Sequence, residues 1–138
     1  MSFRSAMNEF ATAIAADPAY FEAHHNLGYA AQLSRDSARA AEAYECALSI
    51  NPTRADVRYK FAYALWEQKY WYDALVELDR VLAADTSNVS AHLLAAKIYA
   101  EDARDKALAR RHYLRVLELD PSHSQAGNIR DWLTVNPG

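Results

Sequence analysis

The sequence repeats itself at an interval of 34 residues. Three segments that end a helical pattern, AIAADPAY, ALSINPTR and VLAADTSN, place Asp17, Asn51 and Asp85 at this interval. A fourth ending, VLELDPSH, places Asp120 one residue late, at 35. Asn and Asp tolerate the left-handed backbone with which many helices end, and the proline that follows three of the four endings cannot continue a helix. A fixed period of this length predicts an array of stacked repeats.

Each interval contains two helical patterns separated by a short polar break. In residues 21–54 the break is SRDS, where Asp36 and Ser37 are candidate N-caps of the second helix. Residues 55–88 and 89–123 repeat the arrangement, and we expect the extra residue of the last interval in the turn EDARDK, where an insertion costs least. Abundant alanine and only three glycines favour helix throughout. The predicted fold class is therefore all-α, with about seven to eight helices.

The two ends complete a single predicted domain over residues 1–138. Residues 1–20 resemble the second helix of a repeat whose first helix is missing, and they carry an apolar stripe of Phe3, Met7, Phe10 and Ile14. Either this helix caps the array, or the chain is excised from a longer one, or the stripe is an open edge through which copies self-associate. Residues 124–135 are expected to form a polar-faced capping helix.

Residues 21–54 resemble the tetratricopeptide repeat family, a helix–turn–helix of 34 residues. Leu27-Gly28, Ala40, Tyr44, Ala47 and Pro52 stand at the places that define this repeat. The later repeats keep part of the pattern, with small residues at Ala62, Ala74, Ala96 and Ala109 that let paired helices approach closely. The resemblance implies a right-handed superhelix, an α-solenoid, whose first helices line a concave surface that binds peptides or protein segments.

One place departs from the family. The large aromatic residue that is usual early in the first helix is replaced by His24, Arg58 and His92.

Nothing in the sequence assembles a site for catalysis, a metal or a cofactor. Cys46 has no histidine three or four residues away on its helix, which indicates an inert thiol. His24 and His25 are adjacent and so point about 100° apart on a helix, which makes them a poor metal pair. No glycine-rich loop is present to hold phosphate. We therefore expect a non-enzymatic protein without cofactors.

Charge and hydropathy exclude two further classes of partner. A net charge of −3 gives no electrostatic footprint for nucleic acid, and the basic group around Arg110 is diluted by acids. No apolar run approaches the roughly 18 residues of a membrane span, and no signal peptide is recognisable at the start. The single cysteine fits a reducing compartment, so the expected location is the cytoplasm.

The candidate binding residues lie opposite the buried stripes of the first helices, where aromatic residues with polar groups stand at successive turns. The predicted peptide-binding set is His25, Asn26, Tyr29, Tyr59, Lys60, Tyr63, Trp66, Tyr70, Leu93 and Lys97. A competing interpretation is that some of these residues only pack against neighbouring first helices. In the segment WEQKYWYDAL, we expect Trp71 in the core, and Trp66, Tyr70 and Tyr72 in a patch at the rim.

One family function can be tested position by position. Chaperone-adaptor members hold the C-terminal carboxylate of a heat-shock protein with lysine, asparagine and arginine side chains. The matching positions here are His25, Tyr29, Lys60, Ser90 and Leu94, so almost every donor is missing. The predicted partner is instead a mixed aromatic and polar peptide with basic flanks. The alternatives are a self-assembling scaffold and a regulatory segment of a larger protein.

Overall fold

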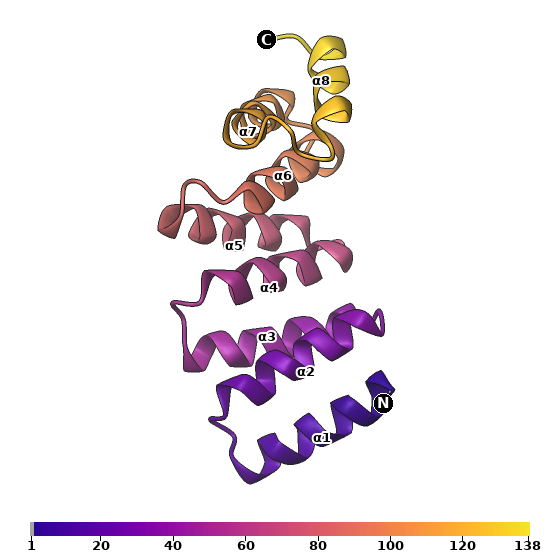
Figure 1. Cartoon of the computed structure of the whole chain (residues 1–138), viewed down its shortest axis with the longest axis vertical. Helices are drawn as coiled ribbons and strands as arrows, with labels where there is room; N and C mark the ends of the chain where they lie inside the picture. Colours follow the sequence, from indigo (N-terminus) through magenta and orange to yellow (C-terminus); the bar gives the residue numbers. More distant parts are fainter. Residues whose placement is uncertain (1) are drawn as a thin grey trace. The chain divides into compact units, whose positions relative to one another are not determined.

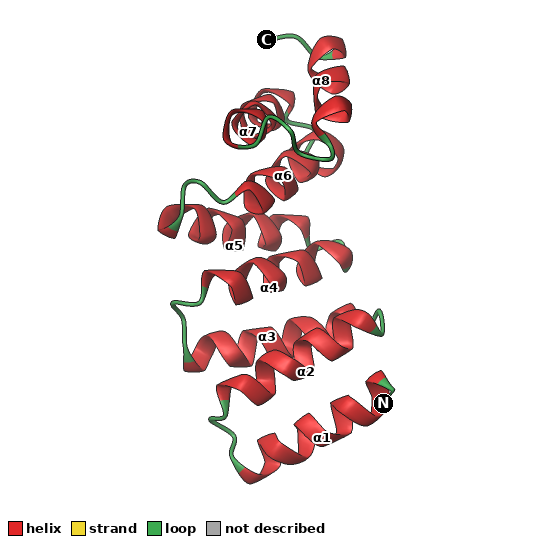
Figure 2. Cartoon of the chain, in the orientation of Figure 1, coloured by secondary structure: helices red, strands yellow, loops and turns green. Residues whose placement is uncertain are grey.

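The computed structural model describes residues 2–138, which form helices and loops without a strand (Figure 2). The helices are α1 (Phe3–Ala16), α2 (Phe21–Leu33), α3 (Ser37–Ile50), α4 (Ala55–Glu67), α5 (Trp71–Ala84), α6 (Val89–Lys97), the π-helical turn η1 (Ile98–Asp102), α7 (Lys106–Leu119) and α8 (Ala126–Val135) (Figure 1). The predicted all-α fold is confirmed, with eight α-helices in the described part. No helix described there combines the length and apolar character of a membrane span.

The chain forms two compact units, and the boundary between Glu77 and Leu78 falls inside α5. In the first unit α1, α2, α3 and α4 pack consecutively along the chain. In the second unit α6 and α7 pair, η1 lies against both, and α8 packs on α7. The division of the chain into repeats at 21–54, 55–88 and 89–123 stays a prediction, although each pair of helices lies within those limits.

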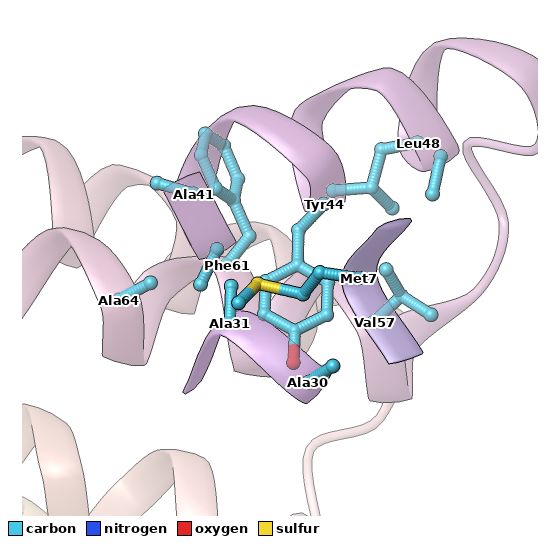
Figure 3. Packing of buried hydrophobic residues seen from close by; sticks show 11 residues of the cluster. Met7, Ala30, Ala31, Ala41, Tyr44, Leu48, Val57, Phe61 and Ala64 are labelled. Carbon is cyan, nitrogen blue, oxygen red and sulfur yellow. The ribbon is translucent and has the colours of Figure 1, made fainter. Parts of the chain in front are cut away.

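Tyr44 of α3 forms the centre of the first unit's core. Its ring is fully buried among Met7 of α1 and Val57 and Phe61 of α4 (Figure 3). The hydroxyl has a hydrogen-bond partner in these apolar surroundings, because it donates a 2.7 Å hydrogen bond to Oε1 of Gln32 on α2. Burial and the neighbouring Tyr29 hydroxyl raise the pKa of Tyr44, so the phenol stays a donor.

Gly28 makes room for this ring. A methyl group built at Gly28 would lie 2.6 Å from the nearest ring carbon of Tyr44, which is well inside van der Waals contact. The small residues at the equivalent places in the other repeats, Ala62 and Ala96, are fully buried, as are Ala40, Ala74 and Ala109 of the second helices. These positions were predicted to let helices approach closely, and all five alanines lie in the interior.

The second unit has its own core. Tyr113 of α7 is buried there and packs against Trp132 of α8, with ring centroids 5.0 Å apart. Ile129 of α8 and Val116 of α7 complete the contact, so the predicted C-terminal capping helix covers the end of α7.

The endings that revealed the period do not have the expected backbone. Asp17, Asn51 and Asp120 are extended rather than left-handed, with φ of −143°, −135° and −143°. At Asp17 and Asn51 the side-chain oxygen instead accepts the backbone N–H two residues on, at 3.1 and 3.3 Å. The prediction of a left-handed ending was wrong because these side chains close an Asx turn that leads directly into the next helix.

The left-handed residues lie in the turns inside each repeat. Arg35, Lys69 and Arg104 have φ of 64°, 70° and 54°, and they stand at equivalent positions in the three repeats. The next residue caps the second helix where it is an aspartate. Asp36 and Asp105 each accept a backbone N–H three residues on, at 3.1 Å, which confirms the candidate cap at Asp36 rather than at Ser37.

The extra residue of the third repeat is absorbed before the turn in which we expected it. The N–H of Ala103 donates to the carbonyl of Ile98, five residues earlier, and this bond closes the π-helical turn η1. An inserted residue that widens one helical turn leaves the following left-handed turn at Arg104 intact. The prediction of an insertion in EDARDK was therefore only partly right, since η1 ends at Asp102 inside that segment.

The residues that replace the usual aromatic share one role. His24 Nε2, Arg58 Nη2 and His92 Nε2 bond the backbone carbonyl six residues earlier, at 2.9, 2.9 and 2.8 Å. Each bond ties the loop that enters a repeat to that repeat's first helix. The polar substitution at this place is thus structural, because it satisfies a carbonyl that would otherwise lack a partner.

We predict that Gly28→Ala destabilises the protein although alanine favours helix. Overpacking against the rigid Tyr44 ring costs about 1–3 kcal/mol, which outweighs the roughly 1 kcal/mol of helix propensity that alanine gains. Gly127→Ala is the matched control, because nothing lies within 4 Å of a methyl group at Gly127 of α8. Urea unfolding should show a lower midpoint for Gly28→Ala and an equal or higher one for Gly127→Ala. Equal shifts would contradict the close approach.

We also predict that Lys69→Gly raises the free energy of unfolding by about 1 kcal/mol, because glycine adopts a left-handed backbone without strain. Lys69→Ala removes the same charge and aliphatic chain but keeps Cβ, so it should bring no gain. Thermal unfolding of the two variants separates relief of backbone strain from loss of the lysine side chain. A gain of the same size in both would rule out the strain.

Candidate peptide-binding face

The predicted binding residues of the first unit gather on one side of α2 and α4. We call this set the first-helix face, and its members are His25, Asn26, Tyr29, Tyr59, Lys60, Tyr63 and Trp66. Residues three and four apart on a helix lie on the same side, so each helix presents its members in a row. Side chains also join the two helices here.

Lys60 forms the centre of the first-helix face. Its Nζ donates to Nε2 of His25 at 3.2 Å and lies 5.2 Å from the centroid of the Tyr29 ring. Among the described residues no carboxylate is within ion-pair distance of Lys60. A cation held by an imidazole and an aromatic ring retains the capacity to bind an acceptor from outside.

The bond from Lys60 fixes the tautomer of His25. Because Nε2 accepts a hydrogen bond, the proton of the neutral ring is on Nδ1. That Nδ1 is buried and has no hydrogen-bond partner, since the carboxylate of Glu22 lies 3.8 Å away. Burial, and next the charge of Lys60, lower the pKa of His25, so the ring is neutral at pH 7.

A row of aromatic rings follows Lys60 along α4. The centroids of Tyr59 and Tyr63 are 6.4 Å apart, and Tyr63 meets Trp66 edge-on at 5.4 Å. All three side chains are half-buried, and burial raises the pKa of Tyr59 so that its hydroxyl remains a donor. Tyr29 of α2 is 49% exposed. These contacts hold the rings in place while leaving part of each accessible.

Sequence reasoning missed Arg54, which joins the N-terminal ends of α2 and α4. Its guanidinium pairs with Asp56 at 2.9 Å, approaches Glu22 at 3.6 Å and lies 5.0 Å from the Phe21 ring. The hydrogen bond from Arg54 and its charge lower the pKa of Asp56. Glu22 and Asp56 are thus both neutralised by one arginine.

The remaining predicted residues lie elsewhere. Leu93 and Lys97 belong to α6 in the second unit, and Leu93 packs against that unit's core. Its neighbour Leu94, one of the positions that match the carboxylate clamp of the family, is buried. In the segment that follows α4, Tyr70 and Tyr72 are exposed, and Trp71 is half-buried with its ring 5.8 Å from that of Tyr72.

The apolar stripe of α1 is not an open edge along its whole length. Met7 is only 7% exposed and belongs to the first unit's core, against which Phe10 also packs. Met7 therefore has to be withdrawn from the predicted self-association edge, because α1 buries it against its neighbours. Phe3 is 46% exposed, and Ile14 lies in the wall of a pocket described below.

No group of three or more His, Cys, Asp or Glu within residues 2–138 is arranged to hold a metal ion.

Lys60→Met should raise the pKa of His25 towards its ordinary value, because it removes the nearest positive charge and the proton that Nε2 accepts. An NMR titration of the histidine ring protons measures this shift. Lys69→Met is the matched control, since Lys69 is not among the charges that act on His25. A His25 pKa that moves equally in both variants would show that the contact with Lys60 does not form in solution.

Comparison with known proteins agrees with this architecture. Residues 21–54, predicted as the first full repeat, match the model of a tetratricopeptide repeat family. The match covers this one repeat of the chain. None of the curated proteins matches its sequence.

Solved structures share the fold at low sequence identity. A crystal structure of MamA is 19% identical over 97% of this chain and 84% of its own, with a TM-score of 0.87. YrrB, described as a tetratricopeptide repeat protein with an unusual peptide-binding site, is 19% identical over 94% of this chain and 66% of its own, with a TM-score of 0.86. The first repeat domain of Spaghetti (RPAP3), bound to the HSP90 peptide SRMEEVD, is 19% identical over 83% of this chain and 94% of its own, with a TM-score of 0.75.

Proposed function

We propose that the protein is a non-enzymatic interaction module and that the first-helix face binds a peptide or protein segment. The observation that carries this proposal is the row of contacting rings from Tyr59 to Trp66 beside Lys60, a cation without a carboxylate partner. Two solved neighbours with this fold are described with a bound peptide or a peptide-binding site. A cytoplasmic location, which the single cysteine fits, belongs to the same proposal.

The chemistry of the face defines the partner it would take. Aromatic rings on a helix supply contact area at little cost in side-chain entropy, and such residues dominate binding energies. Lys60 supplies one donor for a carbonyl or carboxylate of the partner, and Tyr59 and Tyr63 supply hydroxyl groups. Glu22 and Asp56 lie at the margin of the first-helix face. They attract the basic flanks of a partner only where Arg54 leaves their charge uncompensated. An apolar or aromatic side chain beside one acceptor is the pattern that fits best.

We predict that replacing both Tyr63 and Trp66 by alanine weakens peptide binding about 30-fold or more, the size of a hot-spot loss. A binding peptide is first selected from a random peptide library against the intact protein and then titrated by calorimetry. Circular dichroism should show that the helical content of the double variant is retained.

Tyr72→Ala is the matched control, because Tyr72 is an exposed aromatic residue (69%) outside the first-helix face. Its affinity for the selected peptide should equal that of the unaltered protein. If the Tyr63 and Trp66 double variant still binds the peptide at full strength, the assignment of this face is wrong.

A further inference from the structure

Each full repeat brings one pair of equivalent positions together, and the pairs are filled differently. In the second repeat Arg58 Nη1 donates to Oε2 of Glu77 at 2.7 Å. In the third repeat Nδ1 of His92 and Nδ1 of His112 are 2.9 Å apart. In the first repeat the equivalent pair is His24 and Ala43, and alanine has no group to offer.

A pocket of about 280 Å³ lies where that side chain is missing. This volume is near the lower end of small-molecule sites, which begin at about 300 Å³. The walls come from α1, α2 and α3, all in the first unit, and most are apolar. The lining residues are Ala11, Ile14, His24, Leu27, Arg39, Glu42, Ala43 and Cys46.

His24 directs a free ring nitrogen into this pocket. The residue is 8% exposed, and its Nε2–H donates to the carbonyl of Pro18 as Nε2 of His92 does to Thr86. The shared bond gives both rings the same placement, so Nδ1 of His24 faces the space that corresponds to His112. No hydrogen-bond partner for this Nδ1 exists among the described residues, and His24 lines the pocket.

The other polar groups of the pocket define the charge of a ligand. Arg39 is half-buried and has no acidic partner in the described part of the chain, whereas Glu42 is exposed to solvent. Burial, followed by Glu42 and Glu45, raises the pKa of Cys46, so its thiol remains protonated and unreactive. The second repeat shows which group complements a cation at this place, because Glu77 meets Arg58 there.

We propose that this pocket binds a carboxylate on a short aliphatic stem. The carboxylate takes the place that Glu77 has in the second repeat, between Nδ1 of His24 and the guanidinium of Arg39. The methylene groups lie against Ile14 and Leu27. Since Nε2–H of His24 is already bound to Pro18, the complex holds one proton between Nδ1 and the carboxylate.

A free short-chain acid and the glutamate side chain of a partner share this chemistry, and the experiment separates them. Sodium pentanoate and N-acetylglutamate amide are titrated into the isotope-labelled full chain and followed by amide NMR shifts. The expected result is saturable binding, with a dissociation constant on the order of 1 mM, confined to α1, α2 and α3. Tighter binding of pentanoate assigns the site to a free acid, and tighter binding of the glutamate derivative assigns it to a partner's side chain.

Neutral analogues and two variants test the role of each group. Pentanamide and N-acetylglutamine amide should bind at least about tenfold more weakly, because they lose the charged hydrogen bonds. Arg39→Gln should weaken the binding of both acids by a similar factor. Ala43→Glu places a carboxylate opposite His24 as in the second repeat, so it should fill the pocket, abolish binding and preserve the thermal unfolding temperature.

The affinity of the acids should also fall as the pH rises, since one proton is bound with the ligand. Arg39, Glu42 and Cys46 are the titratable or charged groups that face His24 across the pocket, and α1 contributes none. Two results overturn the proposal: neither acid saturates the protein, or acids and neutral analogues bind equally well. If Ala43→Glu lowers the unfolding temperature, Arg39→Gln alone decides between the outcomes.

Discussion

The close approach of paired helices is the constraint on which the rest of this structure depends. Helices can come this near only where one of them carries a small residue, as Gly28 does beside the ring of Tyr44. Ala62 and Ala96 stand at the same place in the later repeats and are fully buried. Because no helix pair buries its apolar side alone, each contact is also what allows the next pair to add to the core. The first-helix face and the pocket of the first unit both follow from this spacing.

The sequence was sufficient to predict the regular part of the fold. The interval of 34 residues, the helical patterns and the aspartate caps at Asp36 and Asp105 each rest on residue types with one dominant local preference. The left-handed turns escaped prediction because Arg35 and Lys69 carry no signal for that backbone. Their position along the repeat, rather than their residue type, imposes the left-handed backbone. The π-helical turn escaped for a similar reason, since an inserted residue can enter a helix or a loop with little trace in the sequence.

The candidate site, like the fold, was predictable only in part from the sequence. Helical spacing correctly grouped Tyr59, Lys60 and Tyr63 on one side of α4, but it gave no indication that Lys60 reaches His25 on the preceding first helix. Spacing also left open whether the apolar stripe of α1 packs or is exposed, and Met7 of that stripe is buried, as is Leu94 of α6. The pocket was predictable in principle. Ala43 stands at the repeat position where Glu77 and His112 carry polar side chains, and such a difference becomes informative only when the pairing with the first helix is known.

The pair of equivalent positions inside each repeat is filled differently in the two units, so the stability of the two units responds differently to acid. Arg58 and Glu77 form an ion pair, whereas His92 and His112 face each other through like groups. Burial, then His92 and Arg111, lower the pKa of His112 to about 4. A folded-state pKa below the ordinary 6.5 means that the unfolded chain binds the proton first, so stability is retained above pH 6.5 and lost as the pH falls towards 4. In the third repeat, the pairing of α6 with α7 is therefore labile in acid because of one side chain, His112 of α7.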